Sequence, residues 1–417
     1  MTIKKISVFI IAVSLAFQFS GIAEATTTIE WMQWFVGEQA NPEGVQSLID
    51  EFQQENPDIE VELVNLPFGK MRETIITNFA VGMTADVLGL NMPWTDEFVE
   101  LGVLEPLEAY LDAATEFTKA DLVQAPVEEY KGHSWMVPLT AHPFIMYYNK
   151  DLLAEAGIAE PPTTWDELKD AAVKITNPDK NQYGYAMHFS SQPPSNGPII
   201  DVYPLLYTTG GRTVKDSRSN LDSPEVVETL TFIKELHDLG VVAPGTLSKP
   251  EAVKIEEFAT GRIGFMIESM PHIGSLPNKN PDLNFGVIPV PKKTESAYRV
   301  HGWEVGMSSK SKHKEEAWKF ISFLMRPDIN VRFAELSRQL PGNTAGKADF
   351  IDKDPLIKVA QDILKEHKSV EELRQTPKAV PSWQLFTVEI QKMLNGEQDP
   401  AATAKNAGEK WNALFDE

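Results

Sequence analysis

The chain has 417 residues, a formal net charge of −22 and a hydrophobic content of 42%. This composition is that of a globular protein with two or three domains, and so acidic a chain argues against partners such as nucleic acid or anionic membranes. The sequence has no cysteine, which excludes disulfides, thiolate chemistry and cysteine-based zinc sites.

The N-terminus has the pattern of a secretory signal peptide over residues 1–25. Lys4 and Lys5 precede an apolar run at residues 6–17, and Ala-Glu-Ala at residues 23–25 matches an A-x-A cleavage site. The apolar run is short for a bilayer span, although an N-terminal anchor helix is the alternative. We expect cleavage after Ala25 and a periplasmic protein. Because no cysteine is available for lipidation, it should diffuse freely.

Strands and helices alternate in the first part of the mature chain. Strands are predicted at residues 28–35, 59–66 and 85–90, with one helix capped by Asn41-Pro42 and another over residues 70–81. Strand–helix alternation at this spacing predicts a largely parallel sheet with helices on its faces. A strand at residues 135–140 would then cross to a second lobe. There, Thr164 and Glu167 form a capping box, and Ser223 caps a further helix.

A strand–helix unit that resembles the first lobe returns late in the chain. It has a strand over residues 300–307 and a helix over residues 312–325, whose apolar residues recur at helical spacing. The chain is therefore predicted to leave one lobe, build another and return, which gives a hinge and a cleft suited to a ligand. The predicted divisions are an N-lobe at 26–140 and 299–337, and a C-lobe at 141–298 and 338–417.

Enzyme and metal motifs fail on their spacing. Residues 342–348 lack the spacing and the Ser/Thr of a phosphate loop, and residues 179–184 resemble a calcium loop only at their start. No HExxH or GxSxG motif occurs. His142 and His301 lie at lobe crossings, where we expect hinge hydrogen bonds rather than metal ligation. No metal and no cofactor are predicted.

Five segments occur in an order similar to that of the extracellular solute-binding proteins of ABC importers, the family of maltose-binding protein. They are residues 82–91, 143–153, 161–175 and 256–269, and the unit from HGWEV at 301–305 to Leu340-Pro341. The resemblance implies an α/β, two-lobed periplasmic binding protein fold of type II. Each lobe would be a mostly parallel sheet flanked by helices, and three crossings would join the lobes.

The resemblance also implies a function. Such a protein captures a sugar, here expected to be a di- or oligosaccharide, by hinge closure and delivers it to the membrane subunits of an ABC permease. We expect a monomer that is not an enzyme.

Tryptophans are placed where such a cleft would need them. Ligands of open α/β sheets lie beyond the carboxyl ends of strands, and an aromatic face with a polar rim suits a pyranose. The aromatic candidates for ligand contact are Trp34, Trp94, Trp303 and Trp383. Trp165 and Trp318 lie on amphipathic helices and are interpreted as packing residues.

Polar groups must supply the rest of the site, because charge-assisted hydrogen bonds hold sugar hydroxyls well. Asp86 matches a family position that lines the cleft, and Tyr147 and Glu268 resemble cleft-facing positions of the second lobe. Arg338 could bind vicinal hydroxyls, but an ion pair across the hinge is favoured slightly. Glu38, in the loop after the first strand, is the weakest candidate.

Two alternatives stay open at this point. One is an exported carbohydrate-active hydrolase, which needs two carboxyl groups about 5–10 Å apart, with Asp86 and Glu268 as the candidates. The other is a binding protein for a glycerophosphodiester, a polyamine or ferric ion. Adjacent tyrosines such as Tyr147 and Tyr148 point to opposite faces of a strand, so this pair alone cannot chelate iron. A phosphate cargo would want several Arg or Lys residues, and only Arg338 is well placed.

Overall fold

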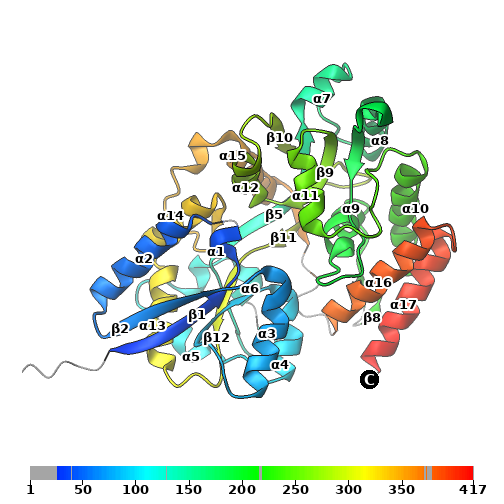
Figure 1. Ribbon diagram of the computed structural model, residues 1–417. Coiled ribbons are helices and arrows are strands. Elements are labelled where there is room, and N and C mark those ends of the chain that lie inside the picture. The colour runs from blue at the N-terminus through cyan, green and yellow to red at the C-terminus, as the bar shows by residue number, and fades with distance from the viewer. Residues whose placement is uncertain are drawn as a thin grey trace, which may run out of the picture.

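The computed structural model describes residues 26–416, except residues 39, 128, 216–217, 371 and 373–377. The expected signal peptide and its cleavage site lie outside the described residues. The described chain forms two lobes, each built around its own sheet (Figure 1).

The sheet of the first lobe has the strand order β2-β1-β3-β12-β4. Its strands are β1 (Thr27–Gln33), β2 (Ile59–Asn65), β3 (Val87–Leu90), β4 (Val137–Pro138) and β12 (Glu304–Met307). β1 runs parallel to β2 and β3, whereas β12 runs antiparallel to β3 and β4. The returning segment therefore completes the sheet that the N-terminal strands begin, as the sequence predicted.

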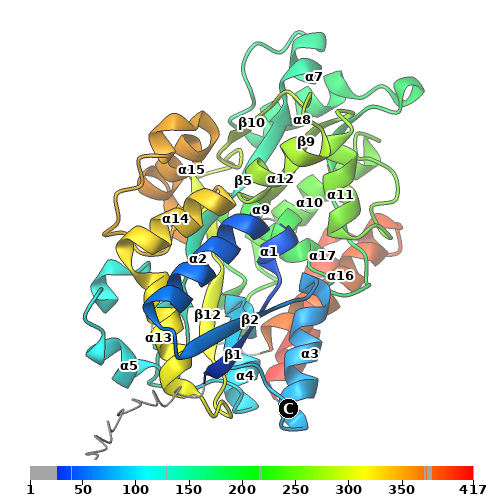
Figure 2. The same ribbon diagram turned by 60° about the vertical axis from the view of Figure 1, so that its left-hand side comes forward.

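Helices cover the first sheet because their apolar residues recur on one face. In α2 (Pro42–Glu55), Asn41 accepts a hydrogen bond from the backbone N–H of Gly44, and the buried face carries Phe52. Phe52 meets Phe320 of α13 (Lys314–Met325) edge to face, with ring centroids 5.0 Å apart. Figure 2 shows α2, α13 and α14 (Pro327–Ser337) side by side. The other helices of this lobe are α1 (Phe35–Glu38), α3 (Phe68–Ala80), α4 (Thr95–Glu100), α5 (Glu108–Ala113) and α6 (Gln124–Val127).

The sheet of the second lobe is organised around the long strand β5 (Thr140–Asn149). Its order is β14-β11-β5-β9-β6, and β10 and β13 also pair with β5. These strands are β6 (Tyr183–Ala186), β9 (Ile263–Ser269), β10 (Phe285–Ile288), β11 (Ala297–His301), β13 (Leu340–Pro341) and β14 (Lys368–Val370). A separate two-stranded ribbon joins β7 (Val214–Lys215) to β8 (Arg218–Ser219).

Two sequence expectations about strands need correction. The sheets are mixed rather than mostly parallel, because β9, β10, β11 and β13 all run antiparallel to β5. The strand expected over residues 300–307 is divided into β11 and β12, which belong to different sheets. The break falls at Gly302 and Trp303, where the chain passes from one lobe to the other.

Two helices of the second lobe begin at the caps that the sequence indicated. Thr164 and Glu167 form the capping box of α8 (Trp165–Ile175), and Ser223 caps α10 (Pro224–Asp238). The others are α7 (Lys150–Glu155), α9 (Tyr203–Thr208), α11 (Glu251–Ala259), α12 (His272–Lys279), α15 (Pro355–Glu366), α16 (Ala379–Leu394) and α17 (Pro400–Phe415).

The three crossings between the lobes are hydrogen-bonded to one another. Leu139 separates β4 from β5, and its backbone N–H donates to the carbonyl of Trp303 at 2.7 Å. The hydroxyl of Thr140 accepts from the N–H of Trp303 at 3.1 Å and donates to Gln339 of the third crossing at 2.9 Å. The crossings are thus held together by one compact set of backbone and side-chain hydrogen bonds at the hinge.

Candidate functional site

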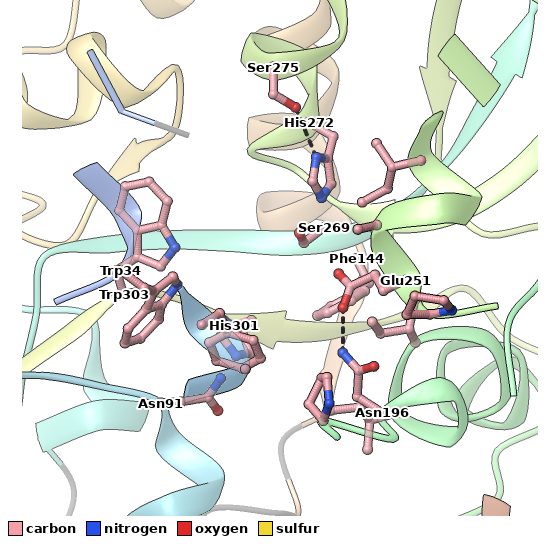
Figure 3. A pocket seen from close by; sticks show the side chains of 18 of the residues that line it. Trp34, Asn91, Phe144, Asn196, Glu251, Ser269, His272, Ser275, His301 and Trp303 are labelled. Carbon is pink, nitrogen blue, oxygen red and sulfur yellow. Dashed lines mark hydrogen bonds between the residues drawn. The ribbon is translucent and has the colours of Figure 1, made fainter. Parts of the chain in front are cut away.

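A cavity of about 510 Å³ lies between the two sheets (Figure 3). The first lobe contributes Trp34, Asn91 and Trp303 from one edge of its sheet. Trp34 follows the end of β1, Asn91 follows the end of the parallel strand β3, and Trp303 precedes the antiparallel strand β12. The second lobe contributes residues from β5, β9, β11, α11 and α12. The volume is typical of a site for a small molecule.

Aromatic side chains form the wall of the cavity on the first lobe. The indole of Trp303 stacks on Phe35, with centroids 4.6 Å apart and planes 11° apart. Trp34 packs against Phe68 at 5.3 Å, and both residues line the cavity. Trp34 and Trp303 are 3% and 2% exposed, so each is a core residue that presents only part of its ring to the cavity.

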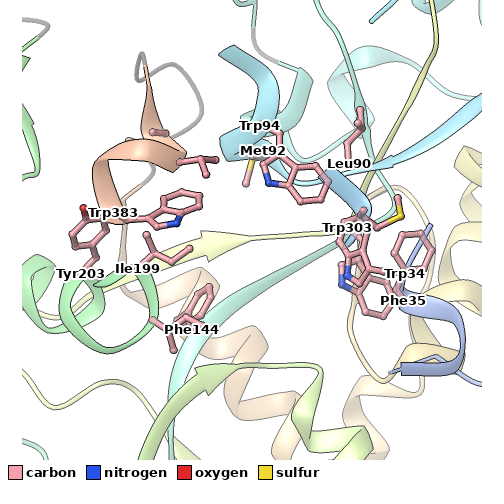
Figure 4. Packing of buried hydrophobic residues seen from close by; sticks show 14 of the residues in the cluster. Trp34, Phe35, Leu90, Met92, Trp94, Phe144, Ile199, Tyr203, Trp303 and Trp383 are labelled. Atoms are coloured by element: carbon pink, nitrogen blue, oxygen red, sulfur yellow. The ribbon is translucent and has the colours of Figure 1, made fainter. Parts of the chain in front are cut away.

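A smaller pocket of about 60 Å³ adjoins this cavity and contains the other two predicted tryptophans. Trp94 stacks on Phe68, with centroids 5.6 Å apart. Trp383, from α16, approaches from the opposite lobe (Figure 4). Its indole N–H donates to the carbonyl of Pro194 at 3.3 Å. Phe68 and Asn91 line both pockets. The four predicted tryptophans therefore line two adjoining pockets.

Polar groups face the aromatic wall from α11 and its neighbours. The Asn196 amide donates to the carboxyl group of Glu251 at 2.5 Å (Figure 3). Burial, reinforced by the nearby carboxylate of Glu268, raises the pKa of Glu251 to about 7. On the first lobe, the buried Oδ1 of Asn91 has no hydrogen-bond partner among the described residues. A buried acceptor of this kind is suited to a ligand hydroxyl.

Two histidines line the cavity at the crossings, and the expected hydrogen bond to the hinge is found for His142. The Nδ1 of His301 is buried without a hydrogen-bond partner among the described residues. Nδ1 of His142 lies 2.7 Å from Oε1 of Gln339, and the ring stacks on His301 at 5.3 Å. Burial lowers the pKa of His142 to about 3 despite the bond to Gln339. Burial, with Arg299 and His142 nearby, also holds the pKa of His301 well below its ordinary value. Both rings are therefore neutral at physiological pH.

A buried ionic cluster lies in the second lobe, beside the cavity. The ammonium group of Lys254 is 3.0 Å from Asp201 and 2.8 Å from Glu268, and all three side chains are fully buried. Burial alone would lower the pKa of Lys254, but the two carboxylates raise it above its ordinary value. Glu268, predicted as a ligand contact, is thus occupied by Lys254 and does not line the cavity.

Three other predicted site residues are placed elsewhere, and the side chain of a fourth is not described. Asp86 lies before β3, at the opposite end of that strand from the cavity, and accepts hydrogen bonds from Glu30 N–H and the Ser311 hydroxyl. The buried Tyr147 hydroxyl donates to the carbonyls of Ser269 and Met270. Arg338 pairs with Asp354 and donates to the carbonyl of Ile273, which is the structural alternative that the sequence favoured. Glu38 ends α1, but its side chain lies outside the described part.

Several cavity-lining residues were not named from the sequence as ligand contacts. They are Phe68, Asn91, Phe144, Asn196, Glu251, His272 and Arg299. The rule that ligands lie at carboxyl ends of strands would have selected Asn91 over Asp86, because Asn91 directly follows β3. Nothing local distinguishes Glu251 from an ordinary surface acid at a helix start.

One group of possible metal ligands was found among the described residues: Glu251, Glu268 and His272. Their nearest donor atoms lie within 4.8 Å of one another. Lys254 already neutralises Glu268, and Nδ1 of His272 lies 2.9 Å from the Ser275 hydroxyl oxygen. An ammonium group inside the cluster opposes a cation there, so the donor set is better suited to internal ion pairing.

No helix in the described parts of the chain combines the length and the apolar character needed to cross a membrane.

A family model described as bacterial extracellular solute-binding protein matches residues 37–331. The maltotriose-binding protein of Pyrococcus abyssi is 28% identical to this chain. The match covers 68% of this chain and 60% of the Pyrococcus protein. The sn-glycerol-3-phosphate-binding periplasmic protein of Agrobacterium fabrum is 25% identical to this chain. The match covers 100% of this chain and 99% of the Agrobacterium protein.

The fold is shared with solved binding proteins. An ABC transporter solute-binding protein of Thermotoga lettingae, bound with α-D-tagatose, is 26% identical with a TM-score of 0.82. The match covers 94% of this chain and 100% of the other. This likeness confirms the two-lobed α/β fold expected from the sequence.

Proposed function

Because this chain belongs to the bacterial extracellular solute-binding protein family, we propose that it is the periplasmic binding component of an ABC sugar importer. The observation that carries this proposal is the cavity between the lobes. Its wall on the first lobe is aromatic, formed by Trp34 and Trp303, and both lobes contribute hydrogen-bonding groups. Rings that contact C–H groups and polar atoms that contact hydroxyls are the two halves of a sugar site.

Closure of the hinge is the proposed means of capture. A ligand that contacts both lobes binds the closed form better than the open form and so shifts the population toward it. A shift from 1:99 to 99:1 needs about 5.5 kcal/mol of differential affinity. The ring faces of Trp34 and Trp303, together with Asn91 and Asn196, can supply contacts of this total strength.

The proposed ligand is a di- or oligosaccharide. The binding of maltotriose and of tagatose by the two sugar-binding relatives supports the sugar class. The smaller pocket supports more than one sugar ring, because Trp94 and Trp383 extend the aromatic surface beyond the main cavity. The glycerol-3-phosphate-binding relative supports a second candidate, a small phosphate ester of a polyol.

We propose that the protein acts as a monomer, presents its ligand to the permease subunits, and binds without converting the ligand. Catalysis by Asp86 and Glu268 would need both carboxyl groups beside one glycosidic bond. Asp86 lies at the far end of β3, and Glu268 is paired with Lys254. The described carboxyl group that lines the cavity is that of Glu251.

Thermal-shift screening of the mature protein against mono- and oligosaccharides tests the function, since a ligand selective for the folded state raises the unfolding midpoint. Calorimetry of each hit should give one site per chain. Chromatography of the recovered ligand should show the input sugar unchanged. Stoichiometric binding without products supports the proposal, and steady release of shorter sugars would replace it with the hydrolase.

A further inference from the structure

Arg299 is a buried cation whose guanidinium has no hydrogen-bond partner in the described protein. It lies on β11, is 1% exposed, and lines the cavity between the lobes. None of its three guanidinium nitrogens has a hydrogen-bond partner among the described residues. A buried polar group is nearly always hydrogen-bonded, and an unpaired buried charge is more costly still, so this arrangement calls for a ligand.

The register of the sheet aims Arg299 into the cavity. On the paired strands β11 and β5, His301 lies opposite His142 and Val300 lies opposite Pro143. The next pair in this register is Arg299 and Phe144, and the guanidinium lies 4.7 Å from the centre of the Phe144 ring. Paired residues share a face of the sheet, and alternation puts residues two apart on that face. His142 and His301 therefore flank the stacked guanidinium on the cavity side.

The other charged groups around the cavity do not compensate Arg299. Glu251 accepts its hydrogen bond from Asn196, and Lys279 pairs with Glu256. Glu268, which does not line the cavity, is paired with Lys254 in the second lobe. His142 and His301 are held neutral, in part by the positive charge of Arg299 itself. No ion pair or hydrogen bond of the Arg299 guanidinium is found among the described residues, so its nitrogens are available to a ligand in the cavity.

We propose that Arg299 receives an oxyanion of the solute, so that the cleft selects an acidic polyol, either a sugar acid or a sugar or glycerol phosphate. This inference rests on the proposed function and specifies its ligand class. A guanidinium presents a planar fork that matches carboxylate and phosphate oxygens, and such charged hydrogen bonds are roughly twice as strong as neutral ones. The unpartnered Oδ1 of Asn91 would meanwhile accept from a hydroxyl of the same solute.

Neutral hydroxyls would satisfy the Arg299 nitrogens less well. They accept hydrogen bonds, but they leave the positive charge uncompensated in a site walled by Phe144, Ile199 and Trp303. An acid supplies both the acceptors and the opposite charge. We therefore expect an acid to bind at least tenfold more tightly than its neutral counterpart.

The test compares matched probes at constant ionic strength. D-glucuronate, D-glucose 6-phosphate and sn-glycerol 3-phosphate are titrated against the mature protein, with D-glucose and glycerol as the neutral counterparts. Unfolding midpoints and calorimetry are the readouts. We expect at least one acid to raise the midpoint and its neutral counterpart to have little effect. The carboxylate and phosphate probes distinguish the two sources of the oxyanion.

Three variants locate the effect. Arg299→Met should abolish the response to the acid, and without solute its midpoint should equal or exceed that of the native protein, because an unpartnered charge has been removed. Arg299→Lys keeps the charge without the fork and should respond weakly, which keeps the test decisive if Arg299→Met folds poorly. Arg332→Met removes a surface arginine paired with Glu51 on α14 and α2, and should respond like the native protein.

Three results would overturn the inference: equal stabilisation by a neutral counterpart, an Arg299→Met response equal to the native one, or no response to any of these probes. Failure of the proposed function is a separate result. If neutral oligosaccharides bind while the acids do not, the sugar importer stands without the oxyanion site. If no saccharide or polyol of either charge binds, both proposals fail.

Discussion

The ring of Phe35 and the indole of Trp303 lie face to face, with centroids 4.6 Å apart and planes 11° apart. Phe333, from α14, meets the same indole edge-on at 6.2 Å. The proposed sugar-stacking ring is thus held from behind by the core of the first lobe. Its orientation is set before any ligand arrives, which lowers the entropy cost of binding.

Replacing Trp303 with a smaller side chain should separate its contribution to sugar binding from its contribution to stability. Trp303→Phe retains an aromatic face against Phe35 but removes ring surface from the cavity, and we expect affinity for the sugar to fall at least tenfold. Trp303→Ala should weaken binding further and also cost about 3–5 kcal/mol of stability, because the Phe35 stack is lost. Calorimetry and urea unfolding measure the two effects.

Trp165→Phe is the matched control for the tryptophan change. Trp165 stacks on Phe232 at 4.6 Å in the same manner but lies on α8, outside the cavity lining. We expect a loss of stability with no change in affinity. Unchanged affinity in both Trp303 variants would show that this ring only packs.

The Asn91 amide should matter for binding and not for stability. Its Oδ1 is buried without a partner among the described residues, so Asn91→Ala removes an unsatisfied group and should leave the free energy of unfolding unchanged or higher. Sugar affinity should fall about tenfold, the value of one lost hydrogen bond.

Asn330 is the counterpart in a fully bonded environment. Its amide donates to the carbonyls of Leu139 and Leu324 and accepts from the N–H of Asn343. Asn330→Ala should therefore cost about 1–3 kcal/mol of stability. A larger stability loss for Asn91→Ala than for Asn330→Ala, seen in parallel denaturation curves, would contradict this assignment.

Glu251 should make the stability of the ligand-free protein depend on pH. Its pKa is raised from 4.5 to about 7. Between these values the folded state keeps a proton that the unfolded state has lost, so stability falls as pH rises from about 4.5 to about 7 and is level above. Denaturation at pH 5 and pH 8 should show a smaller pH difference for Glu251→Gln than for the native protein.

A surface acid provides the comparison for that experiment. Glu409 is largely exposed on α17, with 67% of its side chain accessible, and Glu409→Gln should retain the native pH difference. If Glu251→Gln also retains it in full, the carboxyl group titrates normally and the raised pKa is refuted.

The crossing at Gly302 should not tolerate a side chain. A Cβ there would lie 2.2 Å from the carbonyl oxygen of Thr140, a backbone atom of the hinge that cannot rotate away. We expect Gly302→Ala to destabilise the protein by at least about 2 kcal/mol, as overpacking does. Thermal unfolding of Gly408→Ala is the control, because its nearest neighbour would be 3.6 Å away in a helix that favours alanine. Equal midpoints for both variants would refute the close approach.

Much of the fold could be predicted because its signals are local. The caps at Asn41, Thr164 and Ser223 and the periodic faces of the helices are properties of short segments. The return of the chain to the first sheet followed from pattern and order. The direction of the strands around β5 could not be predicted in this way, because pairing with a crossing strand is set by distant residues.

The candidate site likewise contains residues that local sequence signals predict and residues that only the tertiary structure reveals. The sequence places Trp34 and Trp303 at or near the carboxyl ends of expected strands, and both line the cavity, although Trp303 in fact precedes the antiparallel strand β12. Arg299 is not predicted, because the sequence pattern indicates a single strand over residues 300–307. Only the break at Gly302 determines which sheet Arg299 joins and which way it faces. The unpartnered state of its guanidinium is a property of the surroundings, which no single segment encodes.

Closure of the two lobes on a sugar is tested most directly by a distance across the cavity. The chain has no cysteine, so a Lys70→Cys, Val253→Cys double variant can be spin-labelled at two sites only. Lys70 follows the cavity-lining Gly69 on the first lobe, and the exposed Val253 follows the cavity-lining Ala252 on the second. With a saturating sugar, the distance distribution should shift to shorter values. An unchanged distribution, under conditions where calorimetry shows the sugar bound, would contradict capture by hinge closure.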